Sequence, residues 1–343
     1  MKMCDALVTK ESEVNLICPS LTINKKKLKK NYKILNDFKI RNIFEKKIQM
    51  NFLSRIFFSV KILKDKKINS DNLNYFYLSR SIIFAIIASL FSKNVILEVH
   101  HEFSGVTKML YYILRTVGLL SNLNYIFIHK NLIKIFNVRK DSYICLDDAV
   151  KIEDFDVKRK KLLNKSCIYI GSFHEGKGVE RIASIAKKMK NINFHLYGDK
   201  LFLNKNYDIK NLKFFDFIPY QKVPEVLSKY KIALMPYNDS VKGRLKNTNL
   251  VNYMSPLKMF DYLAASKIIL ASNLKVYKHV LKNKFNSILI KNNDDDWKYW
   301  INKIFTSSSK FEYLKKNARK TAMNFTWKKR SKKITHFAKK VFF

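Results

Sequence analysis

The stretch that decides the fold is Ile168-Tyr-Ile-Gly-Ser-Phe-His-Glu-Gly-Lys-Gly178, which VERIASIAKKM follows directly. A short apolar run, a turn with three glycines, and then apolar residues at helical spacing predict a strand, a tight turn and a helix. Only 7 of the 343 residues are glycine, and four of these lie between Gly171 and Gly198. We therefore expect the backbone of this turn to need glycine.

The predicted turn has the features of an anion site. Backbone N–H groups and the helix dipole at the start of a helix favour negative charge. Gly171 and Gly176 allow a phosphate to approach the backbone, and Lys177 adds a cation. The pattern is neither GxxxxGK[ST] nor GxGxxG, so it predicts neither a Walker loop nor a dinucleotide fingerprint. The alternative is an ordinary βα turn without a ligand.

Short apolar runs alternate with helical stretches on both sides of this turn. We predict strands at 14–18, 75–78, 95–99, 125–129, 143–146, 167–170, 194–197, 213–215, 232–235, 268–271 and 288–290. We predict helices at 81–91, 110–120, 179–189, 223–229 and 256–265, and near 295–305, 311–323 and 327–341. This alternation is typical of parallel sheets covered by helices. The charged, weakly periodic residues 147–166 indicate a connection between two α/β domains.

The stretch from Lys25 to Lys67 is basic and has apolar residues at helical spacing. It predicts an amphipathic helix, for which two interpretations are open. The helix could lie on an anionic membrane, or it could pack on its own domain, which we favour. The longest apolar run, Ser81 to Phe91, is shorter than the ~20 residues of a membrane span and predicts a buried helix.

A second candidate for chemistry is Ser255-Pro-Leu-Lys-Met-Phe-Asp-Tyr-Leu-Ala-Ala265. Ser255 is a natural N-cap, and Pro256 suits the first position of a helix. Lys258 in the first turn opposes the helix dipole, unless an anion binds there. Asp261 follows three residues later on a neighbouring part of the same face and can accept hydrogen bonds from ribose hydroxyls. The pattern indicates a helix that holds phosphate at its start and ribose one turn later.

Composition limits the other function classes. The formal net charge is +40, with 67 basic and 27 acidic residues spread over both halves of the chain. The chain is rich in Lys, Asn and Ile, which A/T-rich codons explain, although the charge still favours anionic partners. No zinc finger, helix-turn-helix or RNP motif supports a nucleic-acid partner. The four cysteines are scattered, which predicts neither a metal site nor disulfides and fits a cytoplasmic protein.

Three segments in order, IYIGSFHEGKGVERI, PYQKVPEVLSKYKIALMPYND and SPLKMFDYLAASKIILASN, resemble the C-terminal domain of group 1 (family-four type) retaining glycosyltransferases. FTWKKRSKKI resembles their last helix, and YFYLSRS, VILEVHHE and ICLDDAVKIEDFD resemble their N-terminal half. The resemblance implies a GT-B fold, in which two Rossmann-like domains with parallel sheets face each other. It implies an acceptor-side domain over 1–150, joined by helix 327–343, and a nucleotide-sugar-binding domain over 151–326.

The resemblance also implies a hexosyl-type transfer with retention, from a nucleotide-sugar co-substrate and without a metal or other cofactor. From the basic surface we expect the acceptor to be a glycan or a lipid-linked glycan of polysaccharide biosynthesis, with peripheral contact at the inner face of the cytoplasmic membrane. Carried over by position, the donor-binding residues are Gly171, Ser172, Lys177, Ser255, Pro256, Lys258 and Asp261. His100 matches the histidine that faces the transferred sugar, with His101 as the neighbouring alternative.

The chain departs from the family pattern at three places. The ExxxxxxxE motif has Tyr253 in place of its first acid and Asp261 in place of its second, and Ser172 replaces the usual basic residue after the strand-end glycine. Residues 1–104 contain no glycine, so the family's first strand and glycine-rich loop have no counterpart. We therefore expect either a start further upstream or a catalytically impaired homologue that acts as a binding or scaffold protein.

Overall fold

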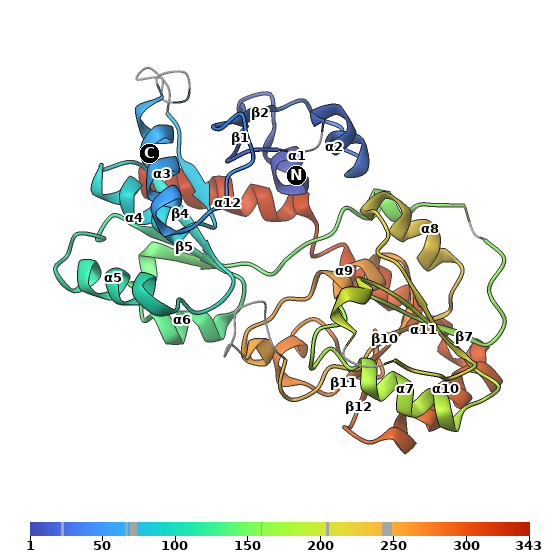
Figure 1. Ribbon diagram of the computed structural model, residues 1–343. Coiled ribbons are helices and arrows are strands. Elements are labelled where there is room, and N and C mark those ends of the chain that lie inside the picture. Colours follow the sequence, from blue (N-terminus) through green and yellow to red (C-terminus); the bar gives the residue numbers. More distant parts are fainter. Residues whose placement is uncertain (22–23, 66–67, 69–73, 159, 204–205, 242–248) are drawn as a thin grey trace. The chain divides into compact units, whose positions relative to one another are not determined.

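The computed structural model describes residues 1–21, 24–65, 68, 74–158, 160–203, 206–241 and 249–343 (Figure 1). The chain divides into two compact units. Unit 1 comprises Met1–Asp147 and Trp327–Phe343, and unit 2 comprises Asp148–Thr326. The division between Asp147 and Asp148 lies three residues before the division expected from the sequence.

Unit 2 is built on a six-stranded sheet with the order β12-β11-β10-β7-β8-β9. All neighbouring strands are parallel. The strands are β7 (Ser166–Ile170), β8 (Asn193–Tyr197), β9 (Leu212–Phe215), β10 (Ile232–Met235), β11 (Ile268–Ser272) and β12 (Ile288–Ile290). The chain runs outward from β7 to β9 and then returns to the other side of β7 with β10. Such a reversal of strand order is the point where doubly wound sheets bind ligands, beyond the carboxyl ends of the strands.

Alternate residues of the central strands enter two separate cores, one on each face of the sheet. Ile168, Ala233 and Met235 pack in one core, whereas Cys167 and Leu234 pack in the other. This period of two follows from the pleat of a strand that is buried on both faces. Helices α8 (Val223–Ser228), α9 (Leu257–Ala264) and α11 (Glu312–Ala322) cover the first face, and α7 (Val179–Lys188) and α10 (Asp294–Thr306) cover the second.

Unit 1 contains a four-stranded parallel sheet with the order β3-β4-β5-β6. Its strands are β3 (Tyr77–Ser79), β4 (Val95–Val99), β5 (Asn124–Phe127) and β6 (Tyr143–Cys145). A second, two-stranded parallel sheet pairs β1 (Asn15–Cys18) with β2 (Lys39–Asn42). The helices of the unit are α1 (Lys2–Leu7), α2 (Lys25–Asn31), α3 (Phe52–Lys64), α4 (Ile82–Leu90), α5 (Gly105–Thr116), α6 (Lys130–Phe136) and α12 (Trp327–Phe342).

The last helix of the chain is part of the core of unit 1. Ile334 and Phe337 of α12 pack against Ile96 of β4 and Ile126 of β5. The apolar residues of α12 recur at helical spacing, with lysines between them, so one face is buried and the other is solvated. Among the residues that the structure describes, no helix is both long and apolar enough to cross a bilayer.

One expectation about the N-terminal region is wrong. The stretch from Lys25 is not one amphipathic helix, because α2, β2 and α3 divide it, and its last two residues lie outside the described part. The helical spacing of apolar residues such as Ile40 and Phe44 is a coincidence, because Ile40 lies in strand β2 and is paired with β1. The strand at 14–18 exists, but β1 is partly exposed because its sheet has only two strands.

Candidate active site

The glycine turn follows β7 at the point where the strand order of unit 2 reverses. Gly171 has φ +151°, and a Cβ atom there would lie 2.4 Å from the Nζ atom of Lys258. Gly178 is the left-handed N-cap residue of α7, with φ +86°, and its Cβ would lie 1.9 Å from the carbonyl oxygen of Pro236. Only glycine fits both positions, which confirms that this part of the backbone requires it.

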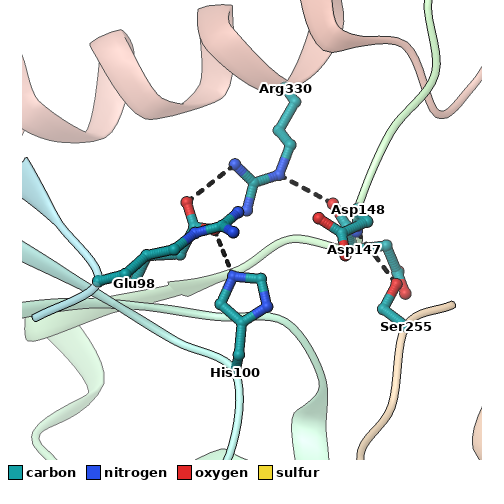
Figure 2. A network of polar contacts seen from close by, with 7 residues as sticks. Glu98, His100, Asp147, Asp148, Ser255 and Arg330 are labelled. Carbon is teal, nitrogen blue, oxygen red and sulfur yellow. Dashed lines mark hydrogen bonds and ion pairs between the residues drawn. The ribbon is translucent and has the colours of Figure 1, made fainter. Parts of the chain in front are cut away.

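Helix α9 begins one residue later than predicted. Pro256 is its N-cap residue, and Leu257 is its first helical residue. Ser255 therefore does not cap the helix. Its buried hydroxyl instead accepts a hydrogen bond of 3.1 Å from the backbone N–H of Asp148, the first residue of unit 2 (Figure 2). The side chain of Ser255 thus holds the entry segment of unit 2 close to the start of α9.

Lys177 and Lys258 form a cluster with two tyrosines, which we call the lysine cluster (Lys177, Lys258, Tyr169 and Tyr237). The Lys258 Nζ lies 3.5 Å from the ring centroid of Tyr169 and 5.2 Å from that of Tyr237. The Lys177 Nζ lies 5.0 Å from the ring centroid of Tyr237. The faces of aromatic rings attract cations. Tyr169 belongs to β7 and Tyr237 follows β10, so the cluster lies at the carboxyl ends of these two adjacent strands.

Among the described residues, Lys258 lacks the partner that a buried cation normally has. The Lys258 Nζ is inaccessible to solvent and has no hydrogen-bond partner among the residues that the structure describes. Burial, and to a smaller degree the charge of Lys177, hold the pKa of Lys258 well below its ordinary value. Burial lowers the pKa of Lys177 to about 8. An anion between these side chains would restore both charges, because an opposite charge favours the ionised form.

The remaining residues that the sequence predicts to bind the nucleotide-sugar donor lie around the lysine cluster. Gly171 contacts Lys258, and the backbone carbonyl of Ser172 accepts a hydrogen bond of 2.8 Å from the hydroxyl of Tyr169. Asp261 lies one turn beyond Lys258 on α9 and is half-buried. Burial and then the charge of Asp261 raise the pKa of Tyr220.

Unit 1 holds a second cluster of charges, which we call the Glu98 network (Glu98, Arg80, His100 and Arg330). Figure 2 labels Glu98, His100 and Arg330. The Glu98 carboxylate, at the end of the buried strand β4, is 4% exposed. It accepts hydrogen bonds from Arg80 Nε and Nη2 at 3.0 and 2.7 Å, and from Arg330 Nη1 at 3.3 Å. Arg330 also donates from Nε to the carbonyl of Asp147 at 2.9 Å.

The structure distinguishes the two neighbouring histidines. His100 Nε2 lies 2.5 Å from a carboxylate oxygen of Glu98, and the imidazole is half-buried. His101 is exposed, and its Nδ1 lies 2.8 Å from the backbone carbonyl of Glu102. His100 is therefore the histidine whose ring is held by a buried side chain.

The sequence reasoning missed Glu98 and Arg330, as well as the two tyrosines of the lysine cluster. The signal for Glu98 was present, since a carboxylate inside the apolar strand VILEV needs a cation nearby. Nothing local identifies Arg330, which lies 232 positions away in the sequence. Among the described residues, no group of three or more His, Cys, Asp or Glu side chains could hold a metal ion.

The model of the family described as "Glycosyl transferases group 1" matches residues 150–321. No curated protein sequence matches the chain with significance.

Solved structures show the same fold at low sequence identity. A glycosyltransferase from Rickettsia africae superposes with a TM-score of 0.75 at 14% identity, covering 99% of this chain and 93% of its own. Sucrose-phosphate synthase from Thermosynechococcus elongatus gives 0.69 at 10% identity, covering 99% and 92%. Anabaena HepE in complex with UDP-glucose gives 0.66 at 13% identity, covering 92% and 90%. The fold is thus GT-B, with a parallel sheet in each unit, and the chain belongs to the group 1 glycosyltransferase family.

Proposed function

We propose that this chain transfers a hexosyl group from a nucleoside-diphosphate sugar to a hydroxyl group of a glycan or lipid-linked glycan, with retention of configuration. The observation that supports it most is the buried Lys258 Nζ atom, which lacks a hydrogen-bond partner among the described residues. It lies against Gly171 at the point where ligands bind doubly wound sheets. A diphosphate is the anion that two adjacent lysines and a helix start suit best.

In this proposal the lysine cluster stabilises the leaving group. As the glycosidic bond breaks, negative charge develops on the nucleoside diphosphate. Lys177 and Lys258 would balance that charge in a site shielded from water, where such electrostatic stabilisation is largest. Lys258 would supply the cation that Ser172 does not, since its ammonium group lies against the neighbouring Gly171. We propose that no metal ion is needed for this step.

The rest of the nucleotide would extend from the lysine cluster along the ends of the strands. Gly198 follows β8 and packs closely on Gly171, since a Cβ atom at Gly198 would lie 2.2 Å from the Gly171 carbonyl oxygen. A cavity of about 650 Å³ opens beside Gly198, Asp199 and Phe217. We propose that Asp261 accepts hydrogen bonds from the ribose hydroxyls, and that His100 of unit 1 contacts the transferred sugar.

We further propose that the acceptor is presented at an anionic membrane, on the inner face of the cytoplasmic membrane. Helix α5 exposes apolar side chains on one face, at a spacing of three to four residues. They are Val106, Met109 and Ile113, together with Val117 directly after the helix, each more than half exposed. The helix also carries Lys108 and Arg115, and residues 103–140 contain no Asp or Glu. An apolar face beside cations is the pattern of helices that lie on anionic bilayers.

The membrane proposal is tested with vesicles. Co-sedimentation with phosphatidylglycerol vesicles should exceed that with phosphatidylcholine vesicles and should fall in a Met109→Ser/Ile113→Ser variant. Leu201→Ser is the control, because Leu201 of unit 2 is 89% exposed and lies outside α5. Equal sedimentation of the α5 variant and the wild-type protein would contradict this part of the proposal.

The transfer proposal is tested with a panel of UDP-, GDP- and ADP-sugars, measured by calorimetry and by release of the nucleoside diphosphate. One donor should bind and be hydrolysed slowly, and Lys177→Met should weaken its binding about tenfold or more. Lys210→Met, at an exposed position of unit 2, is the matched control. Absence of binding to every donor would overturn the proposal. Binding without hydrolysis or transfer would favour the alternative of a catalytically impaired binding protein.

A further inference from the structure

The Glu98 network contains a hydrogen bond whose direction can be assigned. Burial by itself raises the pKa of Glu98, but the hydrogen bond with His100 and the charges of Arg330 and Arg80 outweigh it and hold this pKa well below its ordinary value. Glu98 is therefore a carboxylate, and a carboxylate can only accept hydrogen bonds. Because His100 Nε2 lies 2.5 Å from the Glu98 oxygen, the proton between them belongs to Nε2.

This assignment fixes the other nitrogen of the ring. A neutral imidazole that carries its proton on Nε2 has a lone pair on Nδ1, which then accepts a hydrogen bond. Two guanidinium groups already balance the Glu98 charge, so the carboxylate does not require an imidazolium partner. The ring is thus held at Nε2, while Nδ1 is the atom left to contact a ligand.

We propose that Glu98 is a positioning residue that holds His100 as the Nε2–H tautomer, so that Nδ1 accepts a hydrogen bond from a hydroxyl group of the bound sugar. This inference rests on the proposed function and adds a residue that acts through His100. The ammonium groups of the lysine cluster can only donate, which suits phosphate oxygens. An acceptor at a fixed position, such as His100 Nδ1, selects a hydrogen-bond donor instead, and a sugar hydroxyl can donate.

Nitrogen-15 NMR of the histidine rings tests the proposal without any ligand. Above the ordinary imidazole titration range, at about pH 8, His100 should be a single Nε2–H tautomer, with its signals assigned by their loss in His100→Gln. His195 is an internal control, because its Nδ1 lies 2.7 Å from the Tyr230 hydroxyl in unit 2. A wild-type His100 that carries its proton on Nδ1, or that exchanges between both tautomers, would overturn the proposal.

Glu98→Gln should switch the tautomer. The single amide oxygen can accept hydrogen bonds either from Arg330 or from Arg80 and His100, which share the other carboxylate oxygen in the wild-type protein. Arg330 is buried and has less access to water than Arg80, which is 63% exposed. The oxygen should therefore face Arg330, and the amide NH₂ should face His100. An NH₂ group donates, so the His100 proton should move to Nδ1. Arg80→Gln is the control that keeps the carboxylate, and it should keep the Nε2–H tautomer.

Measurements of kcat and KM distinguish a positioning role of Glu98 from a general structural role. With UDP-glucose as the probe, Glu98→Gln should lower kcat about tenfold, with a smaller change in KM. In a His100→Ala background the same substitution should have no further effect, whereas a merely structural role would give additive losses. If the wild-type enzyme hydrolyses none of the donor panel, the proposed function fails. The ring spectra still decide the role of Glu98, and the wild-type spectrum does so even if Glu98→Gln does not fold.

Discussion

The main buried charges of the two units differ in their partners. In the Glu98 network, the carboxylate has three cationic or ionisable partners within 3.3 Å. In the lysine cluster, two cations lie around one tyrosine ring, and the Lys258 Nζ has no hydrogen-bond partner among the described residues. A buried charge without a partner costs several kcal/mol unless something compensates it. The Glu98 carboxylate is paired on both oxygens within the protein, although the Nη2 atom of Arg330 is buried without a hydrogen-bond partner among the described residues. The Lys258 ammonium group has no hydrogen-bond partner at all among those residues.

The difference shows what each cluster does for the molecule. Arg330 connects the end of β4 to α12 and to the Asp147 carbonyl, so the Glu98 network stabilises unit 1. Lys258 contacts the faces of two tyrosine rings but makes no comparable hydrogen bond among the described residues, and its position at Gly171 costs desolvation and repulsion from Lys177. A cluster that costs stability in the free protein is typical of a binding site.

The largest effect is expected from breaking the Glu98 network. Arg330→Met removes one of the two guanidinium groups and leaves the buried Glu98 charge undercompensated. The free energy of unfolding should fall by about 3–5 kcal/mol, measured by urea denaturation. Lys333→Met, at an exposed position of the same helix, should change it by less than about 0.5 kcal/mol. Similar values for both variants would mean that the network does not stabilise unit 1.

Breaking the lysine cluster should change the free energy of unfolding in the opposite direction. Lys258→Met replaces an uncompensated buried ammonium or amine group by an apolar chain of similar length. The free energy of unfolding should stay the same or rise by about 1 kcal/mol. Affinity for the nucleoside diphosphate should fall about tenfold or more in calorimetry. A clear loss of stability in Lys258→Met would contradict the comparison between the two clusters.

The sequence predicted most of unit 2 and less of unit 1, for physical reasons. Strands such as Ile232–Met235 are continuous apolar runs buried on both faces, so their ends coincide with the ends of the apolar pattern. Strand β2 and helix α3 lie in a partly exposed region, where basic and apolar residues mix and the period is ambiguous.

Some residues of the candidate site could be predicted from the sequence and others could not. Lys177 and Lys258 could be found because each stands next to a local signal, a glycine turn or a helix start. Their convergence on Tyr237 depends on the strand order, which brings β7 and β10 together. The Glu98–Arg330 pair could not be found, because only the folding of α12 onto unit 1 brings these residues together.

We expect both lysines of the lysine cluster to become fully charged when a diphosphate binds. Because burial lowers the pKa of Lys177 to about 8, part of its ammonium form is lost at that pH in the free protein. A bound anion raises the pKa of both lysines, so binding takes up protons and weakens as the pH rises through 8. The nucleotide itself is fully ionised at that pH, since its last phosphate pKa is about 6.

The most direct measurement is calorimetry of UDP binding at pH 8 in two buffers with different ionisation enthalpies. We expect uptake of about half a proton or more on binding, because Lys177 is about half protonated in the free protein at its pKa of about 8. This uptake should be lost in Lys177→Met/Lys258→Met. Binding of UDP with no proton uptake, or with an uptake that the double variant retains, would show that the two lysines do not gain charge on binding.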